Sequence, residues 1–255
     1  MRDAVSQLES ARRPGPEAGW LPLLASAERR ALNDSRWFAA LPTTLRHDLL
    51  RRCEVRRYRP GETIEGAQLA AIASGVVGLA MRRSGEVFQY LPAGTWLVDP
   101  ALFLGGERRH ALVAHGKATI VSVAADALAA ELERHFGLEQ ALLALGHEQL
   151  ALQCEILDEV SGIDIRTRLV RCLARLAAQF GEAEEEGVRI ALDLKQDALA
   201  QLVRASRARV NLHLKALERE GALAVGRQLL LRDPALLARG AGHRPVPLQA
   251  PCGSR

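Results

Sequence analysis

The sequence predicts an α+β protein in which a small β-barrel or jelly roll is followed by a long helix and a C-terminal winged helix-turn-helix. Short β-type runs punctuated by glycine fill residues 54–123, a helical pattern runs on from Leu138, and a helix, turn, helix and hairpin pattern covers residues 195–232. Many short strands at close spacing are typical of antiparallel barrels. The predicted divisions are 1–34 (a disordered or helical extension), 35–137 (the β-domain), 138–163 (the long helix), 164–237 (the winged helix-turn-helix) and 238–255 (a disordered tail).

Composition excludes several classes of protein. The 255 residues are 48% hydrophobic, which gives room for two domains of ordinary size. No run approaches the roughly 18 apolar residues of a membrane-spanning helix, and the mixed-charge N-terminus lacks the apolar core of a secretory signal. We therefore expect a cytoplasmic protein without a membrane partner.

The chain carries no recognisable catalytic or metal-binding motif. No GxSxG, Walker A, HExxH or kinase signature occurs, so we assign no catalytic residue and do not expect an enzyme. The four cysteines are too dispersed for a CxxC pair, and the other candidates lack metal-ligand spacing, so we expect no metal site. The candidates considered are His110, His115, His147 and Cys154.

Residues 20–123 predict a helical lead-in and then a set of strands. Apolar side chains recur at helical spacing on both sides of Pro42, between Trp20 and Cys53. Glycines then separate short runs of β-forming residues. The predicted strands are 55–58, 63–64, 69–73, 76–80, 87–91 and 118–123.

Residues 124–162 predict helix, with two apolar stripes along the part after Leu138. The first stripe follows heptad spacing and contains Leu143, Gly146, Leu150, Gln153, Leu157 and Val160. The second contains Leu142, Leu145, Gln149, Leu152, Ile156 and Ile163. A helix that is apolar on two faces packs against two partners, so one stripe is expected to cover the β-domain and the other to form a coiled-coil seam with a second chain. The alternative is a helix buried inside a monomer.

After this helix, residues 164–180 predict an amphipathic helix, 181–187 an acidic solvated loop and 188–194 a strand. In the helix-turn-helix itself, Ser206 is placed to cap the second helix, and Gly221 to end it. Val210, Leu214 and Leu217 form the apolar face of that second helix. Residues 222–231 predict a two-stranded wing with its turn at Gly226 and Arg227.

The outer face of the second helix carries side chains suited to DNA. Arg207, Asn211 and Lys215 recur every four residues, with Arg209 beside them, and such side chains reach base edges and phosphates from the major groove. Residues 195–232 hold eight Lys and Arg against three Asp and Glu, a net charge of +5, whereas the whole chain sums to +4. This local excess predicts a phosphate-binding surface. The candidate DNA-binding residues are Lys195, Ser206, Arg207, Arg209, Asn211, Lys215 and Arg227.

The order of these parts resembles the cyclic-AMP receptor protein and FNR (Crp/Fnr) family of bacterial transcription regulators. The resemblance covers about residues 35–237, and its most specific segments are 58–62 (YRPGE), 72–75 (IASG), 164–169 (DIRTRL) and 206–217 (SRARVNLHLKAL). It implies a cyclic-nucleotide-binding-like β-domain, a homodimer, double-stranded DNA with a roughly palindromic operator, and RNA polymerase as a partner. Arg207 matches the family's base-reading arginine, whereas Ala208 and Leu212 replace a common glutamate and a common arginine.

The resemblance places an effector pocket at Asp99, Arg109, His110, Gln153 and Cys154. The family's nucleotide-binding Gly-Glu and Arg-Ser pairs fall on Val98-Asp99 and Arg109-His110. Arg109 leaves a place for an anion, but Val98 replaces the glycine that lets the backbone approach a phosphate, and Pro100 removes an N–H. These departures argue against a cyclic nucleotide as the effector, and no cofactor is assigned. The alternative function is a small-molecule sensing module whose helix-turn-helix binds protein.

Overall fold

The structure is a computed structural model that describes residues 23–66, 68–99 and 110–233. Two four-stranded antiparallel sheets form the predicted β-domain. The first has the order β1-β8-β3-β6 and the second β2-β7-β4-β5. The strands are β1 (Cys53–Tyr58), β2 (Thr63–Ile64), β3 (Leu69–Ser74), β4 (Val77–Met81), β5 (Val87–Leu91), β6 (Trp96–Val98), β7 (His110–Ala114) and β8 (Ala118–Val123).

Each side of the first sheet is buried against a different layer. On β3, Ala70 and Ile72 point into the interior between the two sheets, where they join Val77 and Leu112. The alternate residues of β3 belong to a second core that the first sheet shares with the surrounding helices. β8 pairs with both β1 and β3, with Val123 opposite Cys53 on one side and Leu69 on the other, and the β3–β8 register shifts at a bulge between Ile72 and Ser74.

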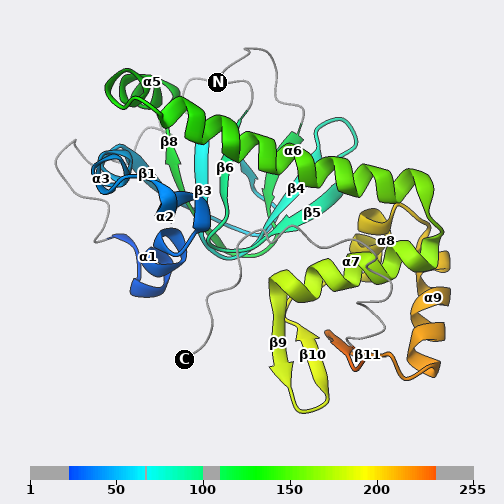
Figure 1. Cartoon of the computed structure of the whole chain (residues 1–255). Coiled ribbons are helices and arrows are strands. Elements are labelled where there is room, and N and C mark those ends of the chain that lie inside the picture. The colour runs from blue at the N-terminus through cyan, green and yellow to red at the C-terminus, as the bar shows by residue number, and fades with distance from the viewer. Residues whose placement is uncertain (1–22, 67, 100–109, 234–255) are drawn as a thin grey trace, which may run out of the picture.

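The helical lead-in is confirmed and divides into three helices, with Pro42 at the start of the third. These are α1 (Ser26–Asn33), α2 (Arg36–Ala40) and α3 (Thr43–Arg51). They and α5 (Ala125–Arg134) pack against the first sheet (Figure 1). Trp96 lies at the centre of this layer, stacked on Phe38 with ring centroids 4.7 Å apart. The predicted extension 1–34 is described only from residue 23, where it contains α1; its earlier part and the predicted tail 238–255 lie outside the described residues.

The helix predicted over 124–162 is two helices. Gly137, with a φ of 97°, separates α5 from α6 (Leu138–Gly162). A left-handed glycine changes the chain direction at no steric cost, so the break falls at this residue. Hydrogen bonds then fasten α6 over the β-domain: Trp37 Nε1 donates to the Ala141 carbonyl at 2.8 Å, and Gln149 Nε2 donates to the Trp96 carbonyl at 3.2 Å.

The two stripes of α6 have different environments. Leu142, Leu145 and Leu152, from the second stripe, are buried. Leu143, Leu150 and Leu157, from the first stripe, are 50%, 57% and 64% exposed. The second stripe therefore covers the chain's own β-domain as predicted, and the first is left open along one face of α6.

The C-terminal region contains the predicted helix-turn-helix and a larger sheet than expected. Residues 181–187, predicted as a loop, form most of a hairpin that joins the wing in a sheet of order β11-β12-β10-β9. Its acidic strand is stabilised by Arg189, which pairs with Glu182 and Glu184. The elements are α7 (Ile165–Phe180), β9 (Gly181–Glu184), β10 (Gly187–Ile190), α8 (Gln196–Val203), α9 (Arg207–Arg219), β11 (Leu223–Val225) and β12 (Leu229–Leu231).

The C-terminal region also packs against the β4–β5 hairpin. Tyr90, on β5, is buried in the same core as Leu173, Leu199 and Leu202. Arg204 forms an ion pair with Glu86 at 2.8 Å. The backbone N–H of Val87 donates to Gln201 Oε1 at 3.3 Å, so α8 contacts β5 through apolar, ionic and hydrogen-bonded contacts.

Candidate nucleic-acid interface

The turn between α8 and α9 is fixed by local backbone geometry. Arg204 has a φ of 52°, which places it in the left-handed region and reverses the chain after α8. Ser206 then caps α9, because its hydroxyl accepts a hydrogen bond from the backbone N–H of Arg209. Gly221, with a φ of 73°, follows the end of α9. The predicted cap and stop signals of α9 are therefore confirmed.

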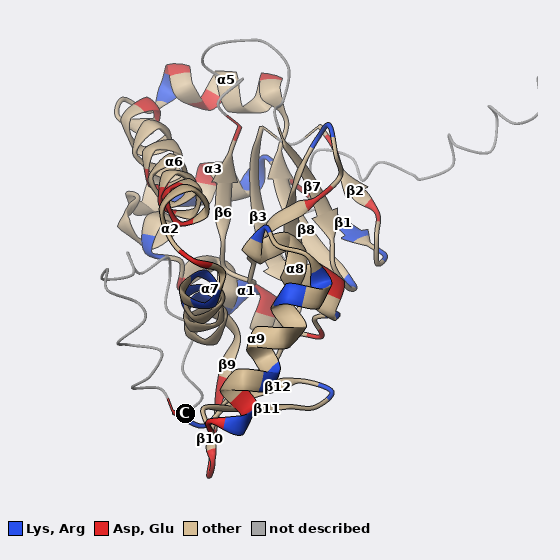
Figure 2. Cartoon of the chain, turned by 90° about the vertical axis from the view of Figure 1, so that its right-hand side faces the viewer, with Lys and Arg blue, Asp and Glu red and all other residues tan. Residues whose placement is uncertain are grey.

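α9 is divided into a buried face and an exposed, basic face. Val210, Leu214 and Leu217 are at most 2% exposed and pack into the core of the C-terminal region. The predicted cations Arg207, Arg209 and Lys215 are exposed, and Asn211 is half-buried. Figure 2 shows basic segments along α9 and at the tip of the loop between β11 and β12. Lys195, before α8, and Arg227, in that loop, are also exposed.

Gln196 is a residue that sequence reasoning missed. Its amide lies between two of the predicted base-reading residues: Arg207 Nε donates to Gln196 Oε1, and Gln196 Nε2 donates to Asn211 Oδ1, both at 3.4 Å. Arg207 also lies 3.5 Å from Asp197. The start of α8 thus orients the side chains that α9 presents. The sequence places Gln196 in the first turn of the first predicted helix, but it gives no signal that this side chain contacts the second helix.

Ala208 and Leu212 lie on the outer face of α9, opposite the buried residues by helical spacing. Leu212 is 62% exposed, although leucine is ordinarily buried. An exposed apolar side chain on a helix that enters the major groove can contact the methyl group of thymine. The departures from the family pattern at these positions therefore create a small apolar surface among cations.

The five residues predicted for an effector pocket are only partly described. Arg109 lies outside the described residues. Asp99 is buried at the end of β6 and His110 begins β7 in the other sheet, whereas Gln153 is half-buried and Cys154 exposed on α6. The backbone N–H of Asp99 donates to the Gln68 carbonyl at 2.8 Å, so it is already occupied.

Known regulators share this combination of domains. Residues 167–239 match the Crp-like helix-turn-helix domain. A CRP-like cAMP-activated global transcriptional regulator of Mycobacterium tuberculosis is 30% identical over 180 residues, which are 69% of this chain and 80% of that protein. The chain belongs to the Crp/Fnr family. It is a DNA-binding transcription regulator, and the alternative of a helix-turn-helix that binds protein is not favoured.

Solved structures of the Crp/Fnr family share the fold. The c-di-GMP responsive global regulator CLP of Xanthomonas campestris superposes with a TM-score of 0.63 at 20% identity, covering 75% of this chain and all of that one. A transcriptional regulator of the CRP family from Thermus thermophilus gives 0.61 at 22% identity, covering 74% of this chain and 97% of the other. Among the helices of the described residues, none combines the length and apolar character needed to cross a membrane.

Proposed function

We propose that this Crp/Fnr protein is a homodimer that binds a roughly palindromic operator, with one α9 in the major groove of each half-site. The observation that carries the proposal is α9, whose apolar face is buried while Arg207, Arg209 and Lys215 are exposed. The exposed leucine stripe of α6 supplies a seam for a second chain. Half-sites then lie about one helical turn, or a multiple of it, apart.

The residues of the interface divide by role. Arg207, oriented by Gln196, reads a guanine with two hydrogen bonds, and Asn211 and Arg209 contribute further base contacts. Ser206 and Lys215 contact phosphates beside α9. Lys195 and Arg227 extend the phosphate contacts to both sides of the helix. RNA polymerase is the proposed protein partner, as expected for a transcription regulator.

DNA binding by this chain is proposed to be independent of cyclic AMP, unlike that of the relative named as cAMP-activated. The backbone at Val98 and Asp99 is not available to a phosphate. Val98 is 3% exposed, in the core that the first sheet shares with the surrounding helices, and the backbone N–H of Asp99 already donates to the Gln68 carbonyl. Selection of bound genomic fragments by the purified protein, with and without cyclic AMP, tests this. A palindromic motif without ligand is expected; a motif that emerges only with cyclic AMP would contradict the proposal.

Two substitutions on α9 distinguish base contacts from phosphate contacts. Arg207→Ala is expected to cost about 1–3 kcal/mol on the selected operator and to relax discrimination at one base pair. Lys215→Ala should weaken all sequences equally and reduce the slope of log affinity against log salt by about one. Fluorescence anisotropy at several salt concentrations measures both, with Arg36→Ala, an exposed arginine on α2, as the control. Equal, sequence-independent losses in both variants would remove Arg207 from its assigned role.

A further inference from the structure

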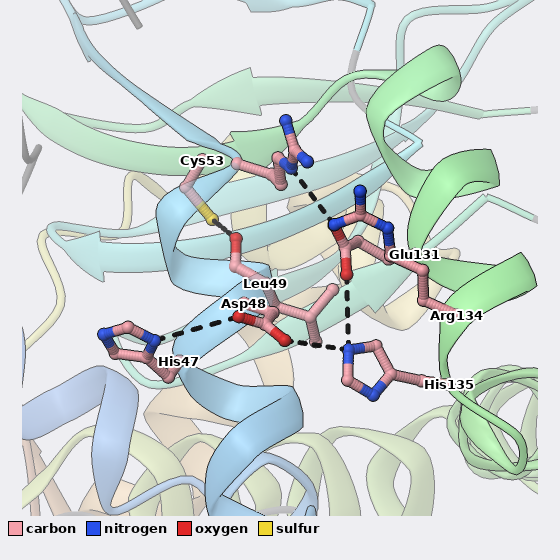
Figure 3. Close-up of polar contacts among 8 residues, drawn as sticks. His47, Asp48, Leu49, Cys53, Glu131, Arg134 and His135 are labelled. Carbon is pink, nitrogen blue, oxygen red and sulfur yellow. Dashed lines mark hydrogen bonds and ion pairs between the residues drawn. The ribbon is translucent and has the colours of Figure 1, made fainter. Parts of the chain in front are cut away.

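Three side chains with metal-ligand chemistry meet at the end of the β-domain away from α9 (Figure 1). Asp48 comes from α3 and Glu131 from the last turn of α5, and His135 is the residue that directly follows α5 as its C-cap. One ligand atom from each lies within 4.8 Å of the other two. Figure 3 shows both carboxylates directed at the same edge of the His135 ring. None of these residues belongs to the DNA-binding surface.

The separations of the two carboxylates from His135 suit a single ion. His135 Nε2 lies 3.0 Å from Asp48 Oδ2 and 3.3 Å from Glu131 Oε2. For metal–ligand bonds of about 2.0–2.1 Å, the edge of a tetrahedron is about 3.3 Å, so these separations match neighbouring ligands of Zn²⁺. The backbone N–H of His135 still donates to the Glu131 carbonyl at 3.0 Å, which holds the two side chains on one face of α5.

Glu131 has a buried oxygen that the described residues leave without a donor. Its side chain is 1% exposed, and Oε1 accepts a hydrogen bond from Arg52 Nε at 3.0 Å. Oε2 accepts none, although His135 Nε2 is near, because that nitrogen carries at most one proton and is already aligned with Asp48. A buried carboxylate oxygen without a donor is costly. A cation at this point would be bound by all three groups at once, which one proton cannot achieve.

The arginines near the cluster are compatible with an ion. Arg52 contacts Oε1 and leaves Oε2 directed at His135, so it orients the ligand as partners behind metal-binding carboxylates commonly do. Arg134 lies 3.9 Å from Oε1 and is 63% exposed, so its charge is largely solvated. Asp48 is 37% exposed, which leaves an open side for water as a further ligand.

We propose that Asp48, Glu131 and His135 bind one divalent transition-metal ion of the Zn²⁺ class. One imidazole with two carboxylates is a donor set that such ions accept. The ion would tie α3 to α5, and α5 leads through Gly137 directly into α6. Metal occupancy would thus stabilise the start of the helix that carries the exposed leucine stripe.

Metal titration of the untagged, chelator-stripped full-length protein tests this site. Calorimetry with Zn²⁺ is expected to give one ion per chain, and Co²⁺ to give a visible absorption band from nitrogen and oxygen ligands. His135→Ala and Asp48→Asn should each weaken binding at least about tenfold. His47→Ala is the matched control, because His47 is 65% exposed, lies 3.8 Å from the other oxygen of Asp48 and is no ligand; it should bind as the unaltered chain does.

Two results would overturn the proposed metal site. Absence of binding by the unaltered protein, or unchanged binding in both ligand variants, would show that the cluster is an ion-pair network. Asp48→Asn alters a partly exposed side chain, so it keeps the test valid if His135→Ala does not fold. A melting temperature raised by Zn²⁺ in the unaltered and His47→Ala proteins, but not in Asp48→Asn, would further support the proposal.

Discussion

At the scale of single residues, the unusual feature of the DNA-binding surface is an apolar side chain among cations. Leu212 is 62% exposed on the outer face of α9 and follows Ala208 by one turn. It contributes little to the core, which Val210, Leu214 and Leu217 fill from the other side. A leucine placed in this way is suited to contact with thymine methyl groups, so we expect it to contribute to binding more than to folding.

Leu212→Ala should therefore separate affinity from stability. We expect the free energy of unfolding to change by less than about 0.5 kcal/mol, as for other exposed positions. Affinity for the selected operator should fall by about 1–2 kcal/mol, since each methylene-sized group removed from a buried contact is worth about 0.8 kcal/mol. Denaturant unfolding and anisotropy measure the two effects. Met81→Ala, at another exposed apolar residue, should change neither, and a stability loss without an affinity loss would contradict this role.

The three cysteines among the described residues differ sharply in environment. Cys154 is exposed on α6, whereas Cys53 and Cys172 are buried, and burial raises the pKa of the Cys172 thiol to about 11. Because the thiolate is the reactive form, Cys172 stays protonated and inert at pH 8. Iodoacetamide should thus alkylate Cys154 in the native protein and spare Cys53 and Cys172, as peptide mass spectrometry can establish. Comparable rates at Cys172 and Cys154 would show that α7 opens readily.

Single-residue roles were predictable where they depend on local sequence. Ser206 was predictable as the cap of α9 because its hydrogen-bond partner, the Arg209 N–H, lies only three residues away in the sequence. The hydrogen bonds of Gln196 to Arg207 and Asn211 depend on how α8 packs across α9. The sequence analysis did not identify the Asp48–Glu131–His135 cluster. Its expectation of no metal site was based on other residues, namely His110, His115, His147 and Cys154. Glu131 and His135 have helical ligand spacing, but Asp48 lies 83 residues before Glu131, and only the packing of α3 on α5 brings it there.

At the scale of elements, period and glycine placement predicted most strands, including the two-residue β2, but missed β6, β7 and β9. β6 has three residues, too few to show a period, and β9 shows no apolar alternation because its main side chains are two glutamates that pair with Arg189. The continuous helix predicted over 124–162 overlooked Gly137. The two stripes of α6 were predictable because each packing partner of a helix requires its own row of apolar residues. In the structure, one of the two stripes is buried against the β-domain.

The open stripe of α6 gives the sharpest test of the dimer. Leu150→Asp places a carboxylate in the middle of the proposed seam, where burying it without a partner costs several kcal/mol, so the dimer dissociation constant should rise at least about 100-fold. Ala144→Asp introduces the same charge at an exposed position of α6 outside the stripe and should leave the dimer intact. Sedimentation velocity distinguishes the two. If both variants stay dimeric, the subunits associate through another surface.

At the scale of the whole molecule, the β-domain and the C-terminal region share a core. Tyr90 is 4% exposed within the core of the C-terminal region, and its ring lies 4.7 Å from that of His115 in an edge-on arrangement. His115 in turn contacts the Asp193 carbonyl through Nε2 at 3.0 Å. The C-terminal region therefore contacts the β-domain through β5, in addition to its covalent connection through α6 and α7. We expect this contact to couple the β-domain to the orientation of α9.

Shared burial at Tyr90 also predicts how the protein unfolds. With Tyr90 in place, the two regions should melt in one calorimetric transition. Tyr90→Ala removes a large side chain from their common core at a cost of about 3 kcal/mol and should split the transition in two, because each region keeps its own interior. Leu79→Ala is the matched control: Leu79, on β4, is buried in the interior between the two sheets, so its loss should lower the melting temperature without splitting the transition. A single transition in the Tyr90→Ala protein would mean that α6 and α7 alone couple the regions, and that β5 has no part in positioning α9.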